Sequence, residues 1–510
     1  MIAKVTSAAV LGLDAIPIEI EVDIQAQGLP SFTIVGLPDK AVEEAKERVR
    51  SAVKNSGFDF PAKRITVNLA PADLPKEGSS YDLPIAMGLL IADGQIEANI
   101  ENLFFTGELS LDGKLRYTNG VLPQVLMAKE RKINKIFLPK INSQEAAIVN
   151  GIEVYPVESL LSLVKHITNE EKIVPAKYIR LDKFENKLSF DFDMSEVAGQ
   201  EQAKRALEIA AAGGHNIILK GPPGAGKTLL ARTLPSILPK LTLDEALEVT
   251  KIYSISGLLD GTPIITKRPF RSPHHTTSHI GLIGGSANPK PGEVSLAHRG
   301  VLFLDEFPEF PRHVLEALRQ PLEDGFVTIS RASKRLTFPS KFLLFAAQNP
   351  CPCGYFGDKT HNCSCAPAQI IRYQKKVSGP MLDRIDIHLD VPAVKVEKLT
   401  SSQKINNETS TAIRNRVQKA RDLQTKRFKT TKISSNAEML NKDIKKYCVL
   451  SDDCIELLKM AVSKMQLSAR SYQRIIKLAR TIADLEGSID IKIQHIAEAL
   501  QFRPQVDSAY

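Results

Sequence analysis

The segment GPPGAGKT, residues 221–228, has the residue types that hold the phosphates of a nucleotide. It matches the pattern G-x-x-x-x-G-K-[ST] and stands between an apolar run and a helical run. Its glycines let backbone N–H groups turn toward phosphate oxygens, while Lys227 would neutralise the β- and γ-phosphates and Thr228 would coordinate Mg²⁺. The residues expected around the phosphates are Gly221, Pro222, Pro223, Gly224, Ala225, Gly226, Lys227 and Thr228. The pattern therefore predicts ATP and Mg²⁺ as cofactors.

Two further segments supply polar residues that hydrolysis of a triphosphate requires. The apolar run GVLFLDE ends in Asp305, which could bind Mg²⁺, and Glu306, which could deprotonate the attacking water. The run FLLFAAQN ends in Asn349, and a polar residue at the carboxyl end of a parallel strand points into the ligand crevice. We expect Asn349 to hold the water or the γ-phosphate.

The elements that must position these residues alternate along the chain. From residue 193 to 395, strands such as HNIILK and KFLLFAAQN alternate with helices, which predicts an α/β ATPase domain with a parallel, doubly wound sheet. Residues 1–170 mix alternating β-branched residues with helical stretches and predict a separate α+β domain. Residues 171–192 are charged and weakly periodic, as in a linker, and residues 396–510 become helical after a polar stretch.

The composition is that of an ordinary soluble protein, with 43% hydrophobic and 25% charged residues. The net charge of +9 permits a polyanionic partner, but the absence of tryptophan argues against a base-stacking platform. Asp14 and Pro17 interrupt the apolar N-terminal stretch, and the apolar run at 83–92 is about half of what a bilayer requires. We expect a cytoplasmic protein without membrane contact.

Longer blocks of sequence add a family resemblance that runs nearly end to end. They include DMSEVAGQEQAKRALEIAAAGGHNIILKGPPGAGKT, RSPHHT followed by PKPGEVSLAHRG, CPCGYFGD and SGPMLDRIDIHLDVP. In these blocks the chain resembles the magnesium-chelatase-like AAA+ ATPases of the ComM/YifB family. The resemblance implies an AAA+ core with a C-terminal helical lid, and it places the adenine against Val197, Gly199 and Gln200.

The same resemblance assigns roles to arginines outside the phosphate loop. It implies an arginine finger at Arg384, reaching into the ATP site of a neighbouring subunit, and a second sensor at Arg470, with Arg474 as the alternative. A guanidinium suits the charge that spreads over the γ-phosphoryl group in the transition state. Because a finger supplied in trans requires neighbouring copies, we expect a homo-oligomeric ring, hexameric as in this family.

Two inserted segments predict hairpins. The insertion at 266–298 carries His274, His275, His279 and His298, but their spacing does not match a metal-binding helix. Within it, IGLIGGSANPKPGE resembles the protruding hairpin that this family shares with MCM helicases. In GFVTISRASKRLTFPSKF, two alternating runs flank a basic turn. The basic residues of this second hairpin, which we expect to contact DNA phosphates, are Arg331, Lys334 and Arg335.

Four of the six cysteines lie in two C-x-C pairs directly after Asn349. Four thiolates from Cys351, Cys353, Cys363 and Cys365 could close a tetrahedral Zn²⁺ site and fasten a loop that has little apolar content of its own. Such a site would be structural, because four protein ligands leave no position open for water. A redox pair or free thiols are the alternatives.

The N-terminal domain resembles the proteolytic domain of Lon in LPKEGSSYDLPIAMGLL and TGELSLDGKLRYTNGVLPQ. Ser80 falls at the position of the Lon nucleophile, whereas the position of the catalytic lysine falls on Leu122. A serine without its general base is not an activated nucleophile. We therefore expect a Lon-type fold without peptidase activity, which could form a collar or a docking surface for a protein.

The residues and the resemblance together favour an ATP-dependent ring motor acting on DNA, similar to the branch-migration helicases that extend heteroduplex in natural transformation. A magnesium-chelatase-type ATPase that remodels a protein partner is the first alternative. An ATP-dependent Lon-like protease is the second.

Overall fold

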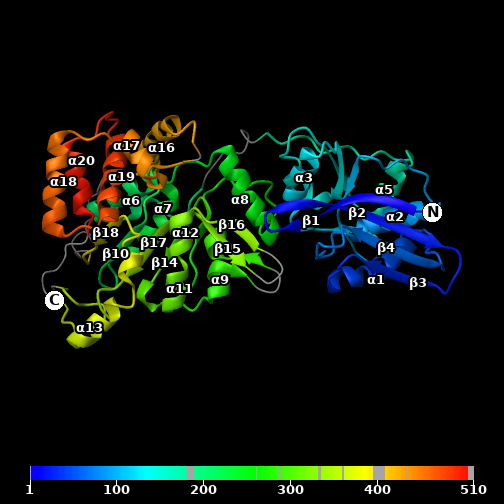
Figure 1. The fold of residues 1–510 in the computed structure, drawn as a ribbon, viewed down its shortest axis with the longest axis horizontal. Coiled ribbons are helices and arrows are strands. Elements are labelled where there is room, and N and C mark those ends of the chain that lie inside the picture. The colour runs from blue at the N-terminus through cyan, green and yellow to red at the C-terminus, as the bar shows by residue number, and fades with distance from the viewer. Residues whose placement is uncertain are drawn as a thin grey trace. The chain divides into compact units, whose positions relative to one another are not determined.

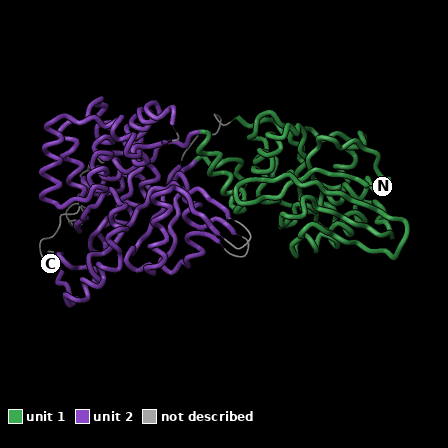
Figure 2. The backbone as a smooth tube through the Cα atoms, viewed as in Figure 1, with its two compact units in different colours: residues 1–186, 243–266 green, residues 187–242, 267–510 purple. Residues whose placement is uncertain are grey.

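The structure is a computed structural model that describes residues 2–180, 189–259, 261–285, 289–330, 335–358, 361–393, 408–431 and 433–503. The chain divides into two compact units (Figure 2). Unit 1 consists of residues 1–186 and 243–266, and unit 2 consists of residues 187–242 and 267–510. In the described part of the chain, no helix is both long and apolar enough to cross a membrane.

Unit 1 is built on a mixed sheet, of which strands β1 to β4 are labelled in Figure 1. Its strand order is β3-β4-β2-β1-β5-β8-β9. The pairs β1–β2 and β2–β4 are antiparallel, whereas the pairs from β1 through β5 and β8 to β9 are parallel. Side chains alternate between buried and exposed along β2, as expected for a sheet with one covered face. The strands of unit 1 are β1 (Ile2–Leu11), β2 (Asp14–Gln25), β3 (Ser31–Val35), β4 (Arg64–Ala70), β5 (Leu103–Phe105), β6 (Glu108–Leu109), β7 (Leu115–Arg116), β8 (Lys135–Pro139) and β9 (Glu153–Val157).

The apolar run at 83–92 forms α2 (Asp82–Ala92), a helix whose residues are all buried and which packs on β1 and β2. Gly88 allows this close packing, because a Cβ there would lie 2.6 Å from Cγ2 of Val22. The run is therefore a core helix. The other helices at this end of the chain are α1 (Lys40–Asn55), α3 (Val121–Glu130), η1 (Lys140–Asn142), α4 (Ser143–Ala146) and α5 (Leu160–Ile167).

A helix from the middle of the chain completes unit 1. Helix α8 (Leu243–Ser256) packs against α3 and buries Val249 and Ile252. Its Ser254 carbonyl accepts a hydrogen bond from the Gly120 N–H at 3.1 Å, and its Ser254 hydroxyl bonds to the buried carboxylate of Glu145. The sequence pattern predicts residues 243–266 within the α/β domain at 193–395, but their packing places them in unit 1.

Unit 2 contains a five-stranded parallel sheet with order β11-β14-β17-β10-β18. The expected parallel α/β sheet is thus confirmed. Strand β17 lies between β10 and β14, so the loops that follow these three strands meet at one edge. The strands of this sheet are β10 (Ile217–Lys220), β11 (Phe270–Arg271), β14 (Val301–Leu304), β17 (Leu343–Gln348) and β18 (Ile387–Asp390).

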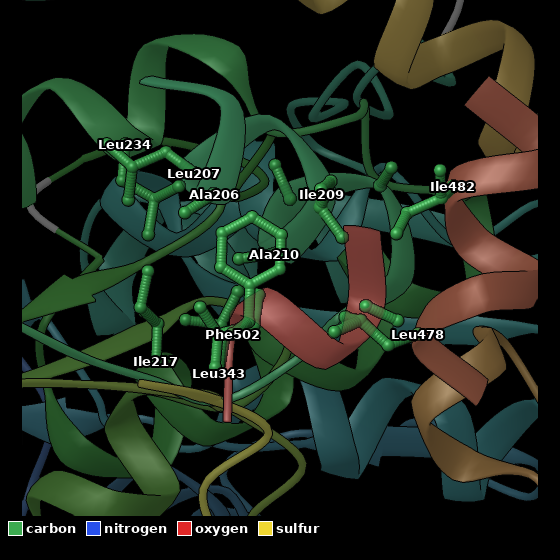
Figure 3. Packing of buried hydrophobic residues seen from close by; sticks show 14 of the residues in the cluster. Ala206, Leu207, Ile209, Ala210, Ile217, Leu234, Leu343, Leu478, Ile482 and Phe502 are labelled. Carbon is green, nitrogen blue, oxygen red and sulfur yellow. The ribbon is translucent and has the colours of Figure 1, made fainter. Parts of the chain in front are cut away.

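The helices that pack on this sheet include some from the C-terminal part of the chain. Apolar side chains of α6, α7, β10, β17 and α19 gather in one cluster, which also contains Phe502 (Figure 3). The five-stranded sheet and the C-terminal helices therefore share a core. The helices of unit 2 are η3 (Met194–Glu196), α6 (Glu201–Gly213), α7 (Lys227–Ile237), α9 (His279–Ile283), α10 (Glu293–Leu296), η4 (Phe307–Glu309), α11 (Arg312–Ala317), α12 (Arg319–Asp324), α13 (Pro367–Gln374), α14 (Gly379–Leu382), α16 (Ser410–Arg427), η5 (Asn436–Glu438), α17 (Asn441–Tyr447), α18 (Asp452–Met465), α19 (Ala469–Leu485) and α20 (Ile493–Gln501).

Both expected hairpins are present. Strands β15 (Phe326–Ser330) and β16 (Arg335–Pro339) pair antiparallel, with Ser330 opposite Arg335. In the first insert, β12 (Gly284–Gly285) and β13 (Lys290–Pro291) form a shorter hairpin, because residues 279–283 are helical.

Candidate nucleotide-binding site

The phosphate loop joins β10 to α7 at the carboxyl edge of the parallel sheet. Gly224 and Gly226 have φ angles of 74° and 84°, in the left-handed region that favours glycine. Helix α7 begins at Lys227, so its N-terminal N–H groups and positive dipole end face the loop. The local sequence thus builds the strand–loop–helix geometry that its spacing predicted, and its role toward phosphate remains an expectation.

Lys227 is held inside this loop. Its Nζ donates hydrogen bonds to the carbonyls of Gly221 at 2.8 Å and Pro222 at 2.9 Å, and to Oδ1 of Asn349 at 3.1 Å. Burial lowers the pKa of Lys227 below its ordinary value, and the Asp305 carboxylate offsets this effect only in part. An anion beside Lys227 would favour its charged form.

Asp305 lies next to Thr228. The Thr228 hydroxyl donates to Oδ2 of Asp305 at 2.8 Å, and the backbone N–H of Glu306 donates to Oδ1 at 2.9 Å. A pocket of about 370 Å³ opens at this point, within the size range of small-molecule sites. Its lining consists of Pro223, Gly224, Ala225, Gly226, Lys227, Thr228, Leu229, Asp305, Glu306, Gln348 and Asn349.

The contact between Glu306 and His275 is not predicted by any sequence pattern. His275 Nδ1 lies 3.2 Å from Oε2 of Glu306, and the His275 ring meets Phe310 edge to face. Glu306 itself has a φ of 51°, an uncommon value for a residue other than glycine. The two adjacent histidines in RSPHHT were the available signal, but a sequence does not show which distant carboxylate they face.

The residues expected around the adenine lie beside the phosphate loop. Gln200 donates to the Pro392 carbonyl at 2.8 Å and to the Ala225 carbonyl at 3.5 Å. Val197 is buried, and Gly199 has a φ of 64°. Their role toward a base remains an expectation.

The structure brings the expected arginine finger and the expected second sensor together on one carboxylate. Arg384, 4% exposed, forms an ion pair with Glu323 and donates to the Pro380 carbonyl. Arg470 Nη1 lies 3.7 Å from the same Glu323. Arg474 instead pairs with the buried Asp386 at 2.7 Å. Within the described part of the chain, none of the three lines the pocket.

The four clustered cysteines converge. Their sulfur atoms lie within 4.8 Å of one another, and Sγ of Cys351 lies 3.4 Å from that of Cys353 and 3.7 Å from that of Cys363. Four sulfurs around zinc at about 2.3 Å would be about 3.8 Å apart. Backbone N–H groups of Cys353 and Phe356 also donate to Sγ atoms of the cluster, so the donor set fits a tetrathiolate metal.

The other expected site residues lie elsewhere. Arg335 is exposed at the start of β16, whereas Arg331 and Lys334 lie outside the described residues. Ser80 is half-buried, and the Leu122 side chain is fully buried in α3. His298 is buried and accepts a hydrogen bond from the Lys341 N–H, while His279 stacks with His313.

Comparison with known families agrees with this architecture. The profile "Magnesium chelatase, subunit ChlI" matches residues 193–399, "Subunit ChlI of Mg-chelatase" matches 20–142, and "Magnesium chelatase, subunit ChlI C-terminal" matches 407–503. The parallel sheet, the phosphate loop and these matches define a magnesium-chelatase-like AAA+ protein, a class that implies ATP and Mg²⁺ as cofactors and an oligomeric assembly.

Relatives that match over nearly the whole chain identify the family within this class. Competence protein ComM of Haemophilus influenzae is 45% identical over 99% of this chain and 98% of that protein. The uncharacterized protein YifB of Escherichia coli is 43% identical over 98% of this chain and 96% of that protein. The magnesium-chelatase 38 kDa subunit of Rhodobacter capsulatus is 24% identical over 31% of this chain and 50% of that protein. The chain therefore belongs to the ComM/YifB family, as its sequence blocks indicated.

Proposed function

We propose that this protein is an ATP-driven ring motor, hexameric as in the AAA+ class, that moves DNA strands through branched junctions during natural transformation. The observation that carries the proposal is its end-to-end similarity to a competence protein, at 45% identity, combined with a complete phosphate loop. The basic hairpin β15–β16 supplies a cationic element that could follow a phosphate backbone without reading its bases.

Each of these residues would have a different role in ATP hydrolysis. Lys227, freed from its carbonyl partners, would bind the β- and γ-phosphates, and Asn349 would orient the γ-phosphate from the end of β17. Glu306 would accept the proton of the attacking water. Arg384 and Arg470 would stabilise the transferred phosphoryl group, Arg384 from a neighbouring subunit.

Thr228 and Asp305 are the residues that would hold Mg²⁺. Their oxygens are hard donors already 2.8 Å apart, which suits a small hard cation. When bound, Mg²⁺ would neutralise charge on the triphosphate.

We infer that the cluster of Cys351, Cys353, Cys363 and Cys365 binds a structural Zn²⁺. The short sulfur–sulfur distances and the N–H donors around the cluster support this assignment. We further infer that residues 1–170 form a Lon-type domain without peptidase activity, because the buried apolar Leu122 cannot act as a base for Ser80.

Strand exchange on a synthetic four-way junction tests the function. Wild-type protein with ATP should convert the junction to duplex products, whereas Glu306→Gln should bind the junction and ATP without converting it. A wild-type protein whose ATPase rate is unchanged by four-way or forked DNA, and which leaves the junction intact, would contradict the proposal.

An ATPase rate that DNA does not change, together with an intact junction, would favour the chelatase-type alternative, in which the ATPase remodels a protein partner. The family matches along the chain are the observation that supports this alternative. The protease alternative is tested separately, because casein degradation that is lost in Ser80→Ala would show an active peptidase.

A further inference from the structure

The cysteine cluster lies against the nucleotide pocket. Cys351 follows Asn349 by two residues, and Cys365 precedes helix α13 by two residues. We call residues 351–358 and 361–365 the cysteine loop. A metal bound by all four sulfurs would therefore tie the end of β17 to the start of α13.

The cysteine loop touches the phosphate loop directly at Gly354. This glycine has a φ of 90°, and a Cβ added to it would lie 2.5 Å from Cδ and 2.7 Å from Cγ of Pro223. Pro223 lines the pocket and has a rigid ring. Gly354 is thus packed against the wall of the nucleotide site.

Helix α13 makes a second connection, to the residue that directly follows Asn349. Gln374 Nε2 donates a hydrogen bond to the Pro350 carbonyl at 3.3 Å. Tyr373, beside Gln374 on α13, is 5% exposed, so this part of the helix is packed in the core. The cysteine loop therefore contacts the pocket wall at Pro223, and the helix after it contacts the residue next to Asn349.

We propose that the metal-bound cysteine loop holds Pro223 and Asn349 in position, so that metal and nucleotide each strengthen binding of the other. The proposal rests on the zinc assignment made above. A metal that fixes the loop removes part of the ordering cost of nucleotide binding, and by linkage the nucleotide must increase the affinity for the metal by the same factor. Couplings of this kind change affinity by about 5- to 150-fold.

The cysteine loop contains its own matched control. Gly357 has a φ of 80°, close to that of Gly354, but a Cβ there meets no atom within 4 Å. Alanine at either position forces a similar left-handed backbone strain. Only Gly354→Ala also pushes on Pro223.

The first test measures binding of a fluorescent ADP analogue by Gly354→Ala and Gly357→Ala, together with zinc content and circular dichroism. Gly354→Ala should keep its zinc and its helical signal but bind the analogue at least about fivefold more weakly than Gly357→Ala. Equal affinities in the two folded variants would overturn the proposal. If Gly354→Ala does not fold, the second test decides.

The second test removes the metal from the side of the cysteine loop away from Asn349. The double variant Cys363→Ser and Cys365→Ser should lose zinc and bind the ADP analogue at least about fivefold more weakly. Bound ADP should raise the zinc affinity of the wild type, measured by competition with a chelator. A zinc-free double variant with wild-type affinity would overturn the coupling. Wild-type protein that contains no metal would overturn the zinc assignment instead, while the comparison of the two glycines would still report on the packing against Pro223.

Discussion

Glu306 and His275 form the pair of side chains through which the pocket connects to the first insert. We expect His275 to be a positioning residue, because its ring lies 3.2 Å from the carboxylate expected to accept the proton of water. Replacing His275 by alanine should lower kcat for ATP hydrolysis about tenfold, equivalent to about 1.4 kcal/mol, and leave KM nearly unchanged. Steady-state ATPase assays measure both constants.

A double-mutant cycle distinguishes positioning from a general loss of structure. His275→Ala should have no further effect on the residual rate when Glu306 is already glutamine. His279→Ala serves as the control, since His279 belongs to the same insert but stacks with His313. An equal loss of rate in His279→Ala would contradict the assignment.

His388 provides a pH-dependent prediction for unit 2. Burial lowers the pKa of His388 to about 4, and the charge of Arg503 acts in the same direction. Because an unfolded histidine titrates near 6.5, the neutral ring contributes its full stability above that pH and loses it as the pH falls toward 4. The free energy of unfolding should therefore drop by up to about 3 kcal/mol through this residue alone.

The variant His388→Gln keeps a donor near the Ile385 carbonyl, which the ring contacts at 3.2 Å, but it does not titrate. Thermal unfolding of both proteins between pH 7.5 and 4.5 checks the prediction. The melting temperature of the wild type should fall further than that of the variant as the pH is lowered across this range. Parallel curves would show that His388 does not carry the effect.

At the scale of elements, the basic hairpin carries the prediction about DNA. Arg335 is exposed at the start of β16, and the sequence places Lys334 beside it. Replacing both by alanine should weaken binding to duplex DNA and reduce the slope of log affinity against log salt by about 1.8, which is 0.9 for each lost phosphate contact. Fluorescence anisotropy at several salt concentrations measures the slope.

The matched control removes two charges from a surface helix of the same unit. Lys445 and Lys446 are exposed on α17, and their double alanine variant should keep the wild-type slope. Equal slopes in both double variants would show that DNA contacts an element other than the hairpin.

The elements differ in how well the sequence predicted them. The hairpin β15–β16 was predicted from its own segment of sequence, because alternation and a turn are local signals. The phosphate loop was predicted for the same reason, since its spacing alone specifies the anion site. The contact of His275 with Glu306, and that of Gly354 with Pro223, join residues far apart in the chain, and local patterns carry no information about such contacts.

At the scale of the whole molecule, the ring proposal requires that Arg384 act in a neighbouring subunit. In the single chain its guanidinium pairs with Glu323, and its Nε has no hydrogen-bond partner among the described residues. Arg384→Ala subunits mixed with wild type should depress ATP hydrolysis below the value expected from dilution, without loss of ATP binding. Hydrolysis proportional to the wild-type fraction would contradict a role in trans.

Glu323→Gln separates this role from a structural ion pair. A finger should still function without its resting partner, so the variant should keep hydrolysis within a few-fold of the wild type. If the ion pair only stabilises the fold, Glu323→Gln and Arg384→Ala should lower the melting temperature alike.

The division of the chain into two units leads to the last prediction, because α8 belongs to unit 1 although its sequence lies between the phosphate loop and β11. Sequence order could not reveal this, since the apolar residues of α8 indicate that it packs but not on what. Val249→Ala should remove about 2 kcal/mol of packing from a fully buried position and speed hydrogen exchange in α3. Val417→Ala makes the same change at a fully buried position of α16, so exchange should instead rise in α6 and α19. If Val249→Ala speeds exchange in α6 and α19 and leaves α3 unchanged, α8 packs in unit 2 and the prediction is wrong. Faster exchange in α3 would show that a segment between the phosphate loop and β11 stabilises unit 1.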